Sequence, residues 1–533
     1  MTYLAVSIGS ETVETAAEQI KAAKKAGAEM LELRTDYLAD LDVEKIRALL
    51  AAARKTALPL LVTCRDRVQG GAAELSPELR TRILVEAIGE GADFIDCEFD
   101  NFVLADTHEK IRAALAERPQ TGLILSTHDF SGPLTNTAKV FNDIARAEPE
   151  AIPKVVYKAD HINDCFAAMD LLLHGDRDAI VLCMGPAGLI TRVLAKKLGA
   201  FATFAALDAA HATAPGQLTV AELKGAFRWD NIGEATEVFG VIGSPVGHSL
   251  SPAIFNACFD AQHIDALYLP LLVEGEKPEF DTFLSNIITR GGGGGTGGGL
   301  GFGGFSVTIP HKTHALDFIN HAGEFVEPLA ETIGAVNTLK IGFGGIVSGY
   351  NTDYAGAIDA LTAAMQIGPH DLHSMKVAVV GAGGAARAVV AGLADVGARV
   401  TIYNRTINKA RDLAGEFKCR YAALEKLGAM DARVLINCTS IGMCPKVDAT
   451  PVPTEGLKPD MVVFDTVYNP RQTKLLKEAA VAGGMCISGI EMFIRQAMAQ
   501  YKICIGQEAD EEVIRKTISD RLQITEPRLQ ASR

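Results

Sequence analysis

The sequence has 533 residues, of which 48% are hydrophobic, and its formal net charge at pH 7 is −14. At about 100 to 200 residues per domain, this length implies three or four domains. No apolar run approaches the roughly 20 residues of a membrane span, and no basic-then-apolar leader opens the chain. The negative charge argues against nucleic-acid and anionic-membrane partners, so an anionic substrate must be met by local arginines and lysines.

The ten cysteines are scattered singly and include no CxxC pair. In a chain of this size they are typical of reduced thiols, most of them in the core, and not of a disulfide framework. We therefore expect a cytoplasmic protein, or one of the plastid stroma if a transit peptide has been removed.

Eight short apolar runs, separated by helical segments, occupy the first 228 residues. The runs are 4–8, 30–33, 58–64, 94–96, 122–126, 152–156, 179–184 and 201–204. Eight β-α units within the size of one domain predict a TIM (β/α)8 barrel, whose active site lies where the strands end.

Polar side chains occur where several of these runs end. They are Glu32, Arg34 and Asp36 in the second run, Thr63 and Arg65 in the third, Asp96 and Glu98 in the fourth, and Thr127 and His128 in the fifth. Lys154 lies inside the sixth run, in the apolar sequence IPKVV. An ammonium in such a strand points into the barrel or toward the helices, and desolvation in either place favours the neutral amine that a Schiff-base nucleophile requires.

This part of the chain resembles the type I 3-dehydroquinate dehydratases over nearly all of residues 1–228. The motifs in the family's order are ELRTDYL at 32–38, TCR at 63–65, STHDF at 126–130, PK at 153–154, MGPAGLITR at 184–192 and TAPGQ at 213–217. The resemblance implies that Lys154 forms an imine with the substrate ketone, that His128 is the general acid/base and that Arg192 holds the carboxylate. It assigns ring-hydroxyl binding and closure of the site to Glu32, Arg34, Arg65, Thr213 and Gln217.

The implied chemistry needs no metal. An iminium is an electron sink, so the neighbouring carbon loses a proton to His128 and the β-hydroxyl leaves as water. Lys158 is a competing nucleophile, but the PK context and the more apolar strand favour Lys154. A buried structural role is the alternative for His128, and the presence of Lys154 and Arg192 at barrel strand ends argues against it.

One departure from the family pattern concerns Gln69. The family usually has an acid there, before Gly70 and Gly71, where it supports the catalytic histidine. Because an amide cannot balance the charge of an imidazolium, we expect His128 to be less basic here and the dehydratase to be slower.

A polar join near residues 228–237 leads to a second region. The sequence FGVIGSPVGHSLSPAIFN at 239–256 predicts a strand, a serine-rich loop and a helix. Ser249 and Ser251 offer hydroxyls in that loop for a ligand, and helix capping is an equal alternative, since Ser251 precedes Pro252. The run GGGGGTGGG at 291–299, continuing as LGFGG to 304, predicts a flexible surface loop, with a glycine-permissive lid near Lys312 as the alternative.

Residues 376–406 contain an apolar run, a glycine cluster, a helix and a second apolar run. This order is typical of a dinucleotide site, and a glycine-rich turn without a ligand is the alternative. Gly381 allows a sharp turn before Ala382, and Gly383 lets backbone amides approach a pyrophosphate; the small residues Gly384, Ala385 and Ala386 let the helix lie close to the strand. Asn404, Arg405 and Thr406 stand where NAD enzymes usually place an acid, which favours a 2′-phosphate and therefore NADP.

From about residue 238 to residue 500 the chain resembles the shikimate dehydrogenases. The motifs are FSVTIPHK at 305–312, AVNTL at 335–339, GYNTDYAG at 349–356, INCTSIGM at 436–443, DTVYNPRQTKLL at 465–476 and GIEMFIRQA at 489–497. The resemblance implies that Ser249 and Ser251 bind the carboxylate, that Asn337, Asp353 and Gln496 bind ring hydroxyls, and that Lys312 and Asp353 form the catalytic pair. We also expect Thr308 and Tyr468 in the substrate site, and Thr439 and Gly489 in the cofactor site.

Reducing a ketone takes a hydride from NADPH and a proton, which Lys312 can donate while Asp353 orients it. Taken alone, a lysine after PH on a loop is more typical of a solvated surface residue, and the motif context favours the catalytic role. Phe255 stands where many relatives have histidine.

Together these patterns predict an α/β chain with three domains. They are a dehydroquinase barrel at 1–228, a substrate-binding domain at 237–350 that is completed by 490–525, and a Rossmann NADP domain at 351–489. The resemblances imply a bifunctional enzyme, as in plants, that converts 3-dehydroquinate to 3-dehydroshikimate and reduces this product to shikimate. Quinate dehydrogenation in the second half is one alternative, against which the paired serines argue by analogy to plant relatives. A catalytically weak half that serves as a scaffold is the other, and Gln69 is its only support.

Overall fold

The computed structural model describes residues 1–291 and 299–525. Within these residues the chain forms two compact units. The first comprises residues 1–252, 264–302 and 343–345, and the second comprises residues 253–263, 303–342 and those from 346 onward. Most of the glycine run for which we predicted a surface loop, residues 292–298, lies outside the described residues.

Eight parallel strands form the centre of the first unit. They are β1 (Tyr3–Ile8), β2 (Met30–Arg34), β3 (Leu60–Thr63), β4 (Phe94–Glu98), β5 (Gly122–Asp129), β6 (Ile152–Lys158), β7 (Ile180–Met184) and β8 (Ala202–Ala205). They pair in the order β7-β6-β5-β4-β3-β2-β1-β8. The backbone amide of Phe201, just before β8, donates to the carbonyl of Ala179, just before β7, at 2.8 Å. The sheet is therefore a nearly closed barrel, which confirms the predicted fold.

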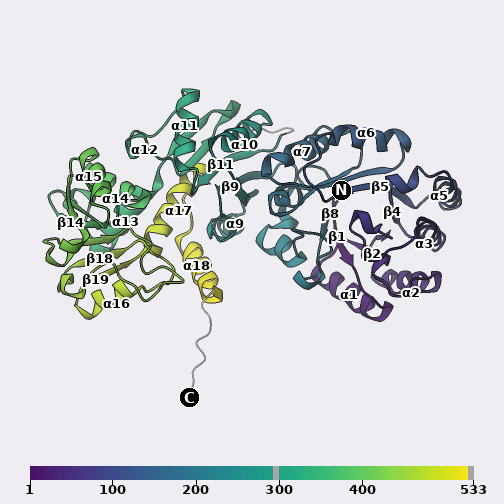
Figure 1. Ribbon diagram of the computed structural model, residues 1–533, viewed down its shortest axis with the longest axis horizontal. Coiled ribbons are helices and arrows are strands. Elements are labelled where there is room, and N and C mark those ends of the chain that lie inside the picture. The colour runs from purple at the N-terminus through teal and green to yellow at the C-terminus, as the bar shows by residue number, and fades with distance from the viewer. Residues whose placement is uncertain (292–298, 526–533) are drawn as a thin grey trace, which may run out of the picture. The chain divides into compact units, whose positions relative to one another are not determined.

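Helices connect consecutive strands and lie outside the barrel (Figure 1). They are α1 (Val13–Ala26), α2 (Val43–Arg54), α3 (Pro77–Gly89), α4 (Phe99–Phe102), α5 (Ala105–Glu117), α6 (Thr137–Ala147), α7 (Phe166–Leu173) and α8 (Leu189–Val193). Local sequence explains their ends. The hydroxyl of Thr12 caps the start of α1, and α1 stops at Gly27, whose φ of +96° is a left-handed conformation that suits glycine.

The barrel interior changes from apolar to charged along the strands. Near the amino-terminal ends it is filled by a cluster that includes Ala5, Met30, Leu61 and Ile124. Toward the carboxyl ends the buried residues become polar, so that all of β2 is buried although it contains Glu32 and Arg34. The charged side chains therefore gather at the end of the barrel where active sites of this fold lie.

The polar join that we predicted after the barrel contains a buried aromatic residue that the sequence did not indicate. Trp229 is 0% exposed, its Nε1 donates to the Glu29 carboxylate at 3.2 Å, and the Lys196 ammonium lies 5.0 Å from its ring centroid. Beyond it, β9 (Glu237–Gly243) and β10 (Ala266–Leu272) pair in parallel, with α9 (Ser251–Gln262) between them in the chain and α10 (Lys277–Thr289) after them. Because its sequence neighbours are charged or polar, the burial of Trp229 was not evident from the sequence.

An antiparallel set follows in the chain, formed by β11 (Phe302–Val307), β12 (Thr338–Ile341) and β13 (Val347–Tyr350), where β12 pairs with both others. Helices α11 (Lys312–Ala322) and α12 (Pro328–Ile333) lie between β11 and β12 in the chain, and α13 (Thr352–Met365) follows β13. The Asn351 side chain accepts from the Asp353 amide at 3.0 Å and so caps α13.

A six-stranded parallel sheet follows, in the order β16-β15-β14-β17-β18-β19. Its strands are β14 (Lys376–Val380), β15 (Arg399–Asn404), β16 (Arg420–Ala423), β17 (Val434–Asn437), β18 (Val462–Asp465) and β19 (Met485–Ser488). Its helices are α14 (Gly384–Asp395), α15 (Ile407–Glu416) and α16 (Lys474–Val481). The chain continues with α17 (Gly489–Ile505) and α18 (Glu511–Thr525). Numbered along the chain, this is the strand order 3-2-1-4-5-6 of a Rossmann fold. Val377 and Val379 enter the core on one face, and Ala378 and Val380 enter the core on the other.

None of the helices in the described part of the chain combines the length and the apolar character that a membrane crossing needs.

Candidate active sites

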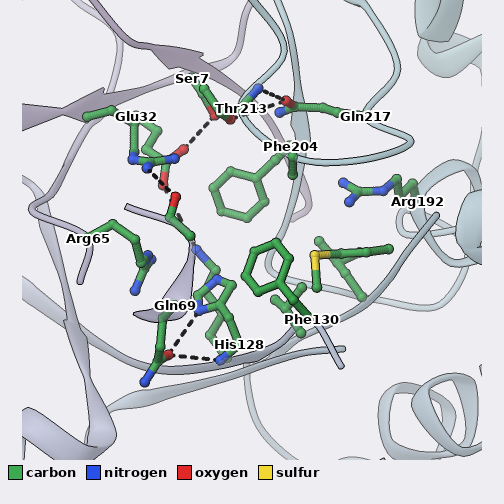
Figure 2. A pocket seen from close by; sticks show the side chains of 17 residues that line it. Ser7, Glu32, Arg65, Gln69, His128, Phe130, Arg192, Phe204, Thr213 and Gln217 are labelled. Carbon is green, nitrogen blue, oxygen red and sulfur yellow. Dashed lines mark hydrogen bonds and ion pairs between the residues drawn. The ribbon is translucent and has the colours of Figure 1, made fainter. Parts of the chain in front are cut away.

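A cavity opens at the carboxyl end of the barrel (Figure 2). It is lined by Ser7, Glu32, Arg34, Arg65, Gln69, Gly70, His128, Phe130, Lys154, Val156, Leu182, Met184, Arg192, Phe204, Thr213, Ala214 and Gln217. Every barrel residue that the sequence singled out as a site residue is in this set. Segments far apart in the chain, from Ser7 to Gln217, therefore contribute to one site.

Lys154 points into the barrel and is 3% exposed. Its Nζ donates to Asp96 Oδ2 at 2.7 Å, lies 4.0 Å from Glu32 Oε1, and sits 4.2 Å from the centroid of the Phe204 ring. Lys158, the competing nucleophile, is nearly half exposed and pairs with Asp160 at 2.6 Å. The geometry therefore places Lys154, and not Lys158, in the cavity.

Asp96 and Glu98 had no assigned role in our sequence analysis, although both follow the strand alternation of β4. Arg65 donates to Asp96 Oδ2 and to Glu98 Oε1, both at 2.8 Å, and all three side chains are buried. Burial would raise the pKa of Asp96, but the charges of Arg65 and Lys154 outweigh it and hold the pKa well below its ordinary range. Asp96 is therefore a fixed negative charge beside Lys154.

His128 and Gln69 lie side by side (Figure 2). Gln69 Oε1 accepts from the backbone amide of His128 at 2.9 Å and lies 3.4 Å from its ring Nδ1. Because a carbonyl oxygen only accepts, this contact favours the proton on Nδ1 and leaves Nε2 free as a base. Burial, followed by the positive charges of Arg65 and Lys154, lowers the pKa of His128 well below its ordinary value, so the imidazole is neutral.

Arg192, in α8, is a buried cation without an anion. It is 3% exposed, its Nε has no hydrogen-bond partner in the described part of the chain, and burial lowers its pKa to about 10. In Figure 2 the guanidinium is directed toward the pocket, and no dashed line reaches it. An uncompensated buried charge is unfavourable, so this position suits an anionic ligand group.

The remaining predicted barrel residues have partners within the protein. Glu32 accepts from the hydroxyl of Ser7 at 2.5 Å and from that of Thr63 at 3.0 Å. Arg34 makes a two-point contact with Asp36, at 2.9 and 2.7 Å. Gln217 Oε1 accepts from the Thr213 amide at 2.7 Å and from the Thr213 hydroxyl at 3.2 Å. These contacts fix the orientation of the groups that face the cavity.

A second cleft, of about 660 Å³, lies within the second unit. It is lined by Thr308, Ile309, Pro310, Lys312, Thr313, Gly334, Ala335, Asn351, Asp353, Gly384, Ala385, Arg387, Thr466, Tyr468, Gly489, Met492, Phe493 and Gln496. This set joins predicted substrate residues to predicted cofactor residues. Tyr468 stacks on Phe493 in this cleft, with the ring centroids 5.4 Å apart.

Lys312 and Asp353 form a close ion pair in this cleft, with Nζ and Oδ2 2.5 Å apart. Lys312 is the first residue of α11, and not a loop residue as the motif suggested. Asn337 is fully buried, and its Nδ2 donates to Asp353 Oδ1 at 2.9 Å. Gln500, which our sequence analysis missed, donates to the Asn337 carbonyl at 3.2 Å. The orientation of Asp353 is therefore set by Asn337, just before β12, and Gln500 of α17 in turn holds the Asn337 backbone.

Ser249 and Ser251 precede and begin α9. The Ser249 hydroxyl accepts from the Ser251 amide at 3.3 Å, so Ser249 serves the helix start. Phe255, where many relatives of the resembled family have histidine, is buried beside Phe259 and Tyr501.

The glycine-rich turn between β14 and α14 has space for a phosphate. Gly381 has a φ of +115°, and a Cβ there would lie 3.2 Å from the Cys438 carbonyl and from Thr439, so only glycine fits. Gly383 precedes α14, whose start has no side-chain cap, and a Cβ at Gly383 or Gly384 would meet nothing within 4 Å. The helix amides are therefore accessible to an anion such as a pyrophosphate.

This geometry corrects one expectation, because Gly384 is not needed for close helix-to-strand packing. The fully buried Ala386 serves that purpose. At the end of β15, the Asn404 side chain donates to the Thr406 carbonyl at 2.9 Å, and Arg405 is exposed. The Thr439 hydroxyl donates to Asn437 at 2.7 Å. Among the residues that the structure places, no three His, Cys, Asp or Glu side chains gather as a metal site would require.

Three family descriptions match consecutive parts of the chain. They are the type I 3-dehydroquinase at residues 4–234, the shikimate dehydrogenase substrate binding domain at 241–339, and the shikimate / quinate 5-dehydrogenase at 362–466.

Individual relatives match over longer stretches. The chain is 34% identical over 530 residues to the chloroplastic bifunctional 3-dehydroquinate dehydratase/shikimate dehydrogenase of Arabidopsis thaliana, which covers 96% of this chain and 82% of that protein. It is 39% identical over 299 residues to the shikimate dehydrogenase (NADP(+)) of Methanosarcina barkeri, covering 54% of this chain and 99% of that one. A crystal structure of a shikimate dehydrogenase in complex with NADP+ is 35% identical and gives a TM-score of 0.49, covering 55% of this chain and 97% of that one.

Proposed function

Because the chain belongs to the family of bifunctional 3-dehydroquinate dehydratase/shikimate dehydrogenases, we propose which of its own side chains carry each of the two reactions. The enzyme dehydrates 3-dehydroquinate to 3-dehydroshikimate and reduces this product to shikimate with NADPH. We assign the dehydration to the barrel cavity and the reduction to the cleft of the second unit. One observation carries the first assignment: Lys154, His128 and the unpaired Arg192 line one buried cavity.

In the barrel, Arg192 binds the carboxylate of the substrate, which supplies the anion that this buried guanidinium lacks. The Lys154 nitrogen then forms a bond to the ketone carbon, and the carbonyl oxygen leaves as water, so that an iminium remains. The neutral imidazole of His128 takes the proton from the neighbouring carbon. It returns the proton to the departing β-hydroxyl, which leaves as a second water. One water then hydrolyses the product iminium, which restores the ketone and the Lys154 amine, so the net loss is one water. Glu32, Arg34, Arg65, Thr213 and Gln217 hold the ring hydroxyls.

In the second unit, the Lys312 ammonium donates a proton to the developing alkoxide of the substrate ketone, and its charge stabilises that oxygen. Asp353 orients Lys312 through their 2.5 Å contact, and Asn337 orients Asp353. We assign ring-hydroxyl and carboxylate contacts of the substrate to Thr308, Tyr468, Gln496, Ser249 and Ser251.

The cofactor is NADP, which supplies the hydride when it is bound. The uncapped start of α14 fits its pyrophosphate. We assign cofactor binding to Gly381, Ala382, Gly383, Gly384, Ala385, Asn404, Arg405, Thr406, Thr439 and Gly489. The exposed Arg405 guanidinium is suited to a 2′-phosphate.

We further propose a division into a barrel at 1–228 together with the Trp229 turn, a substrate-binding domain at 237–350 completed by 490–525, and a Rossmann domain at 351–489. We also propose a cytoplasmic or plastid-stroma location. All ten cysteines are free thiols in the structure, which is typical of a reducing compartment.

Two alanine variants of the whole chain test this assignment. Lys154→Ala removes the imine nitrogen, so we expect dehydration to fall to background while NADPH reduction of supplied 3-dehydroshikimate continues. Lys312→Ala should have the opposite effect, and Lys158→Ala, the matched control, should leave both rates near wild type. Each reaction is assayed separately in steady state, with quinate and NADP+ as an additional substrate pair.

Chemical trapping identifies the nucleophile directly. Sodium borohydride added with 3-dehydroshikimate reduces an imine to a stable amine, so peptide mass mapping should locate the adduct at Lys154. An adduct at Lys158, or none in a protein that still dehydrates, would refute the role of Lys154. Loss of both activities in either alanine variant would contradict the assignment to two independent sites.

A further inference from the structure

The carboxylate of Asp96 is the closest charged group to the Lys154 nitrogen. It is 0% exposed, and its Oδ2 accepts from Lys154 Nζ at 2.7 Å and from Arg65 at 2.8 Å. Its Oδ1 accepts from the Ser126 hydroxyl at 2.6 Å. Both oxygens are therefore fixed by donors from β6, from β5 and from the segment just after β3, and the carboxylate cannot move away from Lys154 without breaking these bonds.

Arg65 has further partners in the protein besides Asp96. Its second terminal nitrogen donates to Glu98 at 2.8 Å and to the Ser126 hydroxyl at 2.7 Å. If Asp96 lost its charge, Arg65 would still have these two acceptors. This arrangement makes the charge of Asp96 separable from the position of Arg65, so the two can be tested independently.

The other charged groups around Lys154 come from several strands. Glu32 on β2 lies 4.0 Å from the nitrogen, and Arg65, just after β3, shares Asp96 with it. His128 on β5 is close enough to interact electrostatically with Asp96 when it is protonated, and the cavity is also lined by Arg34 and Arg192. Asp96 is thus the one carboxylate in direct contact with the reacting nitrogen among the residues that the structure describes.

We propose that Asp96 is the counter-ion of the Lys154 nitrogen during dehydration, a role that rests on the imine mechanism proposed above. An ammonium and a ketone give an iminium and one water: two of the three nitrogen-bound protons leave with the carbonyl oxygen, and the nitrogen keeps one proton and its positive charge. A carboxylate fixed at 2.7 Å therefore balances the same charge before and after the bond forms.

The same carboxylate serves the next step. When His128 takes the carbon-bound proton, the electron pair moves to the nitrogen, which becomes neutral, and the positive charge passes to the imidazole. Asp96 lies within the electrostatic reach of both groups. Its pKa is held well below the ordinary range, so it stays ionised and the proton goes to His128 instead.

Asp96→Asn tests this role, because the amide keeps the shape of the side chain and removes the charge, while its NH2 group can face the Ser126 hydroxyl, which is able to accept a hydrogen bond. The wild type and the variant are treated as full chains with 3-dehydroshikimate and borohydride between pH 6 and pH 10, and the trapped fraction is read by intact mass. Loss of the counter-ion destabilises the protonated imine, so the alkaline limb of trapping should move to lower pH by about one to three units. Dehydration at pH 8 should fall at least about tenfold.

Ser126→Ala is the matched control, since it removes one hydrogen bond to Asp96 and one to Arg65 but no charge. It should lower the rate by less than about threefold and leave the alkaline limb in place. The counter-ion role would be overturned if Asp96→Asn traps with the wild-type pH profile. It would also be overturned if the alkaline limb of Ser126→Ala moved as far as that of Asp96→Asn. Absence of trapping in the wild type itself would instead refute the imine mechanism, so the two failures are distinguishable.

Folding of the variants is checked by circular dichroism of the full chain and by NADPH reduction in the second unit. If Asp96→Asn does not fold, Asp96→Glu decides the matter, because it retains the charge on a side chain one methylene longer. A wild-type alkaline limb in Asp96→Glu, with a reduced rate, supports the proposal. If Asp96→Glu folds and its alkaline limb nevertheless moves to lower pH, as expected for a loss of charge, the proposal is overturned.

Discussion

Replacing Arg192 with methionine should make the barrel more stable and catalytically inactive. The guanidinium is buried without an anionic partner in the described residues, and burial lowers its pKa to about 10. An ordinary arginine titrates above pH 12, so the difference of at least about two pH units corresponds to about 3 kcal/mol against the charged form in the folded state.

The direction of this effect follows from protonation. Below about pH 10 the guanidinium is charged in both the folded and the unfolded chain, so at neutral pH the folded state carries the whole penalty. The penalty lessens only as the pH rises through 10, which lies outside the normal working range. An apolar side chain of similar length removes it at every pH.

We expect Arg192→Met to recover about 1 to 3 kcal/mol, which for a domain of this size raises the barrel's Tm by several degrees. Loss of a charge-assisted contact to the substrate carboxylate should lower kcat/KM for dehydration at least about a hundredfold. Reduction in the second unit should not change. Differential scanning calorimetry and the two separate activity assays measure these quantities.

Arg80→Met is the matched control in the same barrel. Arg80 is equally buried, but it pairs with Asp66 at 2.7 Å and donates to the Leu75 carbonyl at 2.9 Å. Its removal leaves a carboxylate uncompensated and should lower the Tm. If Arg192→Met lowered the Tm as Arg80→Met does, Arg192 would have a stabilising role in the free protein, and the reasoning would be refuted.

Two further substitutions test the cofactor and the base. The enzyme should prefer NADPH over NADH in kcat/KM by a factor of ten or more, because Arg405 forms charge-assisted bonds with the 2′-phosphate, and Arg405→Ala should reduce this preference and leave the chemistry intact; equal values for the two cofactors in the wild type would contradict it. Gln69→Glu places a carboxylate next to Nδ1 of His128 and should raise the pKa of that imidazole. Since the base must be neutral, the acid limb of the dehydratase pH profile should move to higher pH, and an unmoved limb would mean that the Gln69 contact does not control His128.

The fold followed closely from the sequence because parallel strands buried on both faces read as continuous apolar runs. All eight runs correspond to barrel strands. The ends were less accurate: β5 and β6 continue to Asp129 and Lys158, because the hydrogen-bond ladder extends beyond the apolar residues into the polar rim. Strand limits depend on pairing partners, which a single sequence does not display.

The sequence predicted the site residues because the family motifs occur at the carboxyl ends of the strands. It could not predict which charged side chains pair with them. Lys154 and Asp96 lie 58 positions apart on strands that are not neighbours, so their contact depends on the curvature of the barrel. The sequence also could not predict that Arg192 has no anion beside it, because this depends on all the residues that the fold places around the side chain. The deep burial of Trp229 was hidden by its charged neighbours in the sequence.

The anchoring of Trp229 bears on how this chain can be divided. A fragment ending at Arg228 would lose the indole that fills a fully enclosed space, and Glu29 would lose its indole donor. An excised barrel therefore needs the residues through Ile232, which is itself buried. The segment that connects the two enzymes is thus a structural part of the first one. A gene split after Arg228 would yield a barrel that lacks the side chain covering this part of its core.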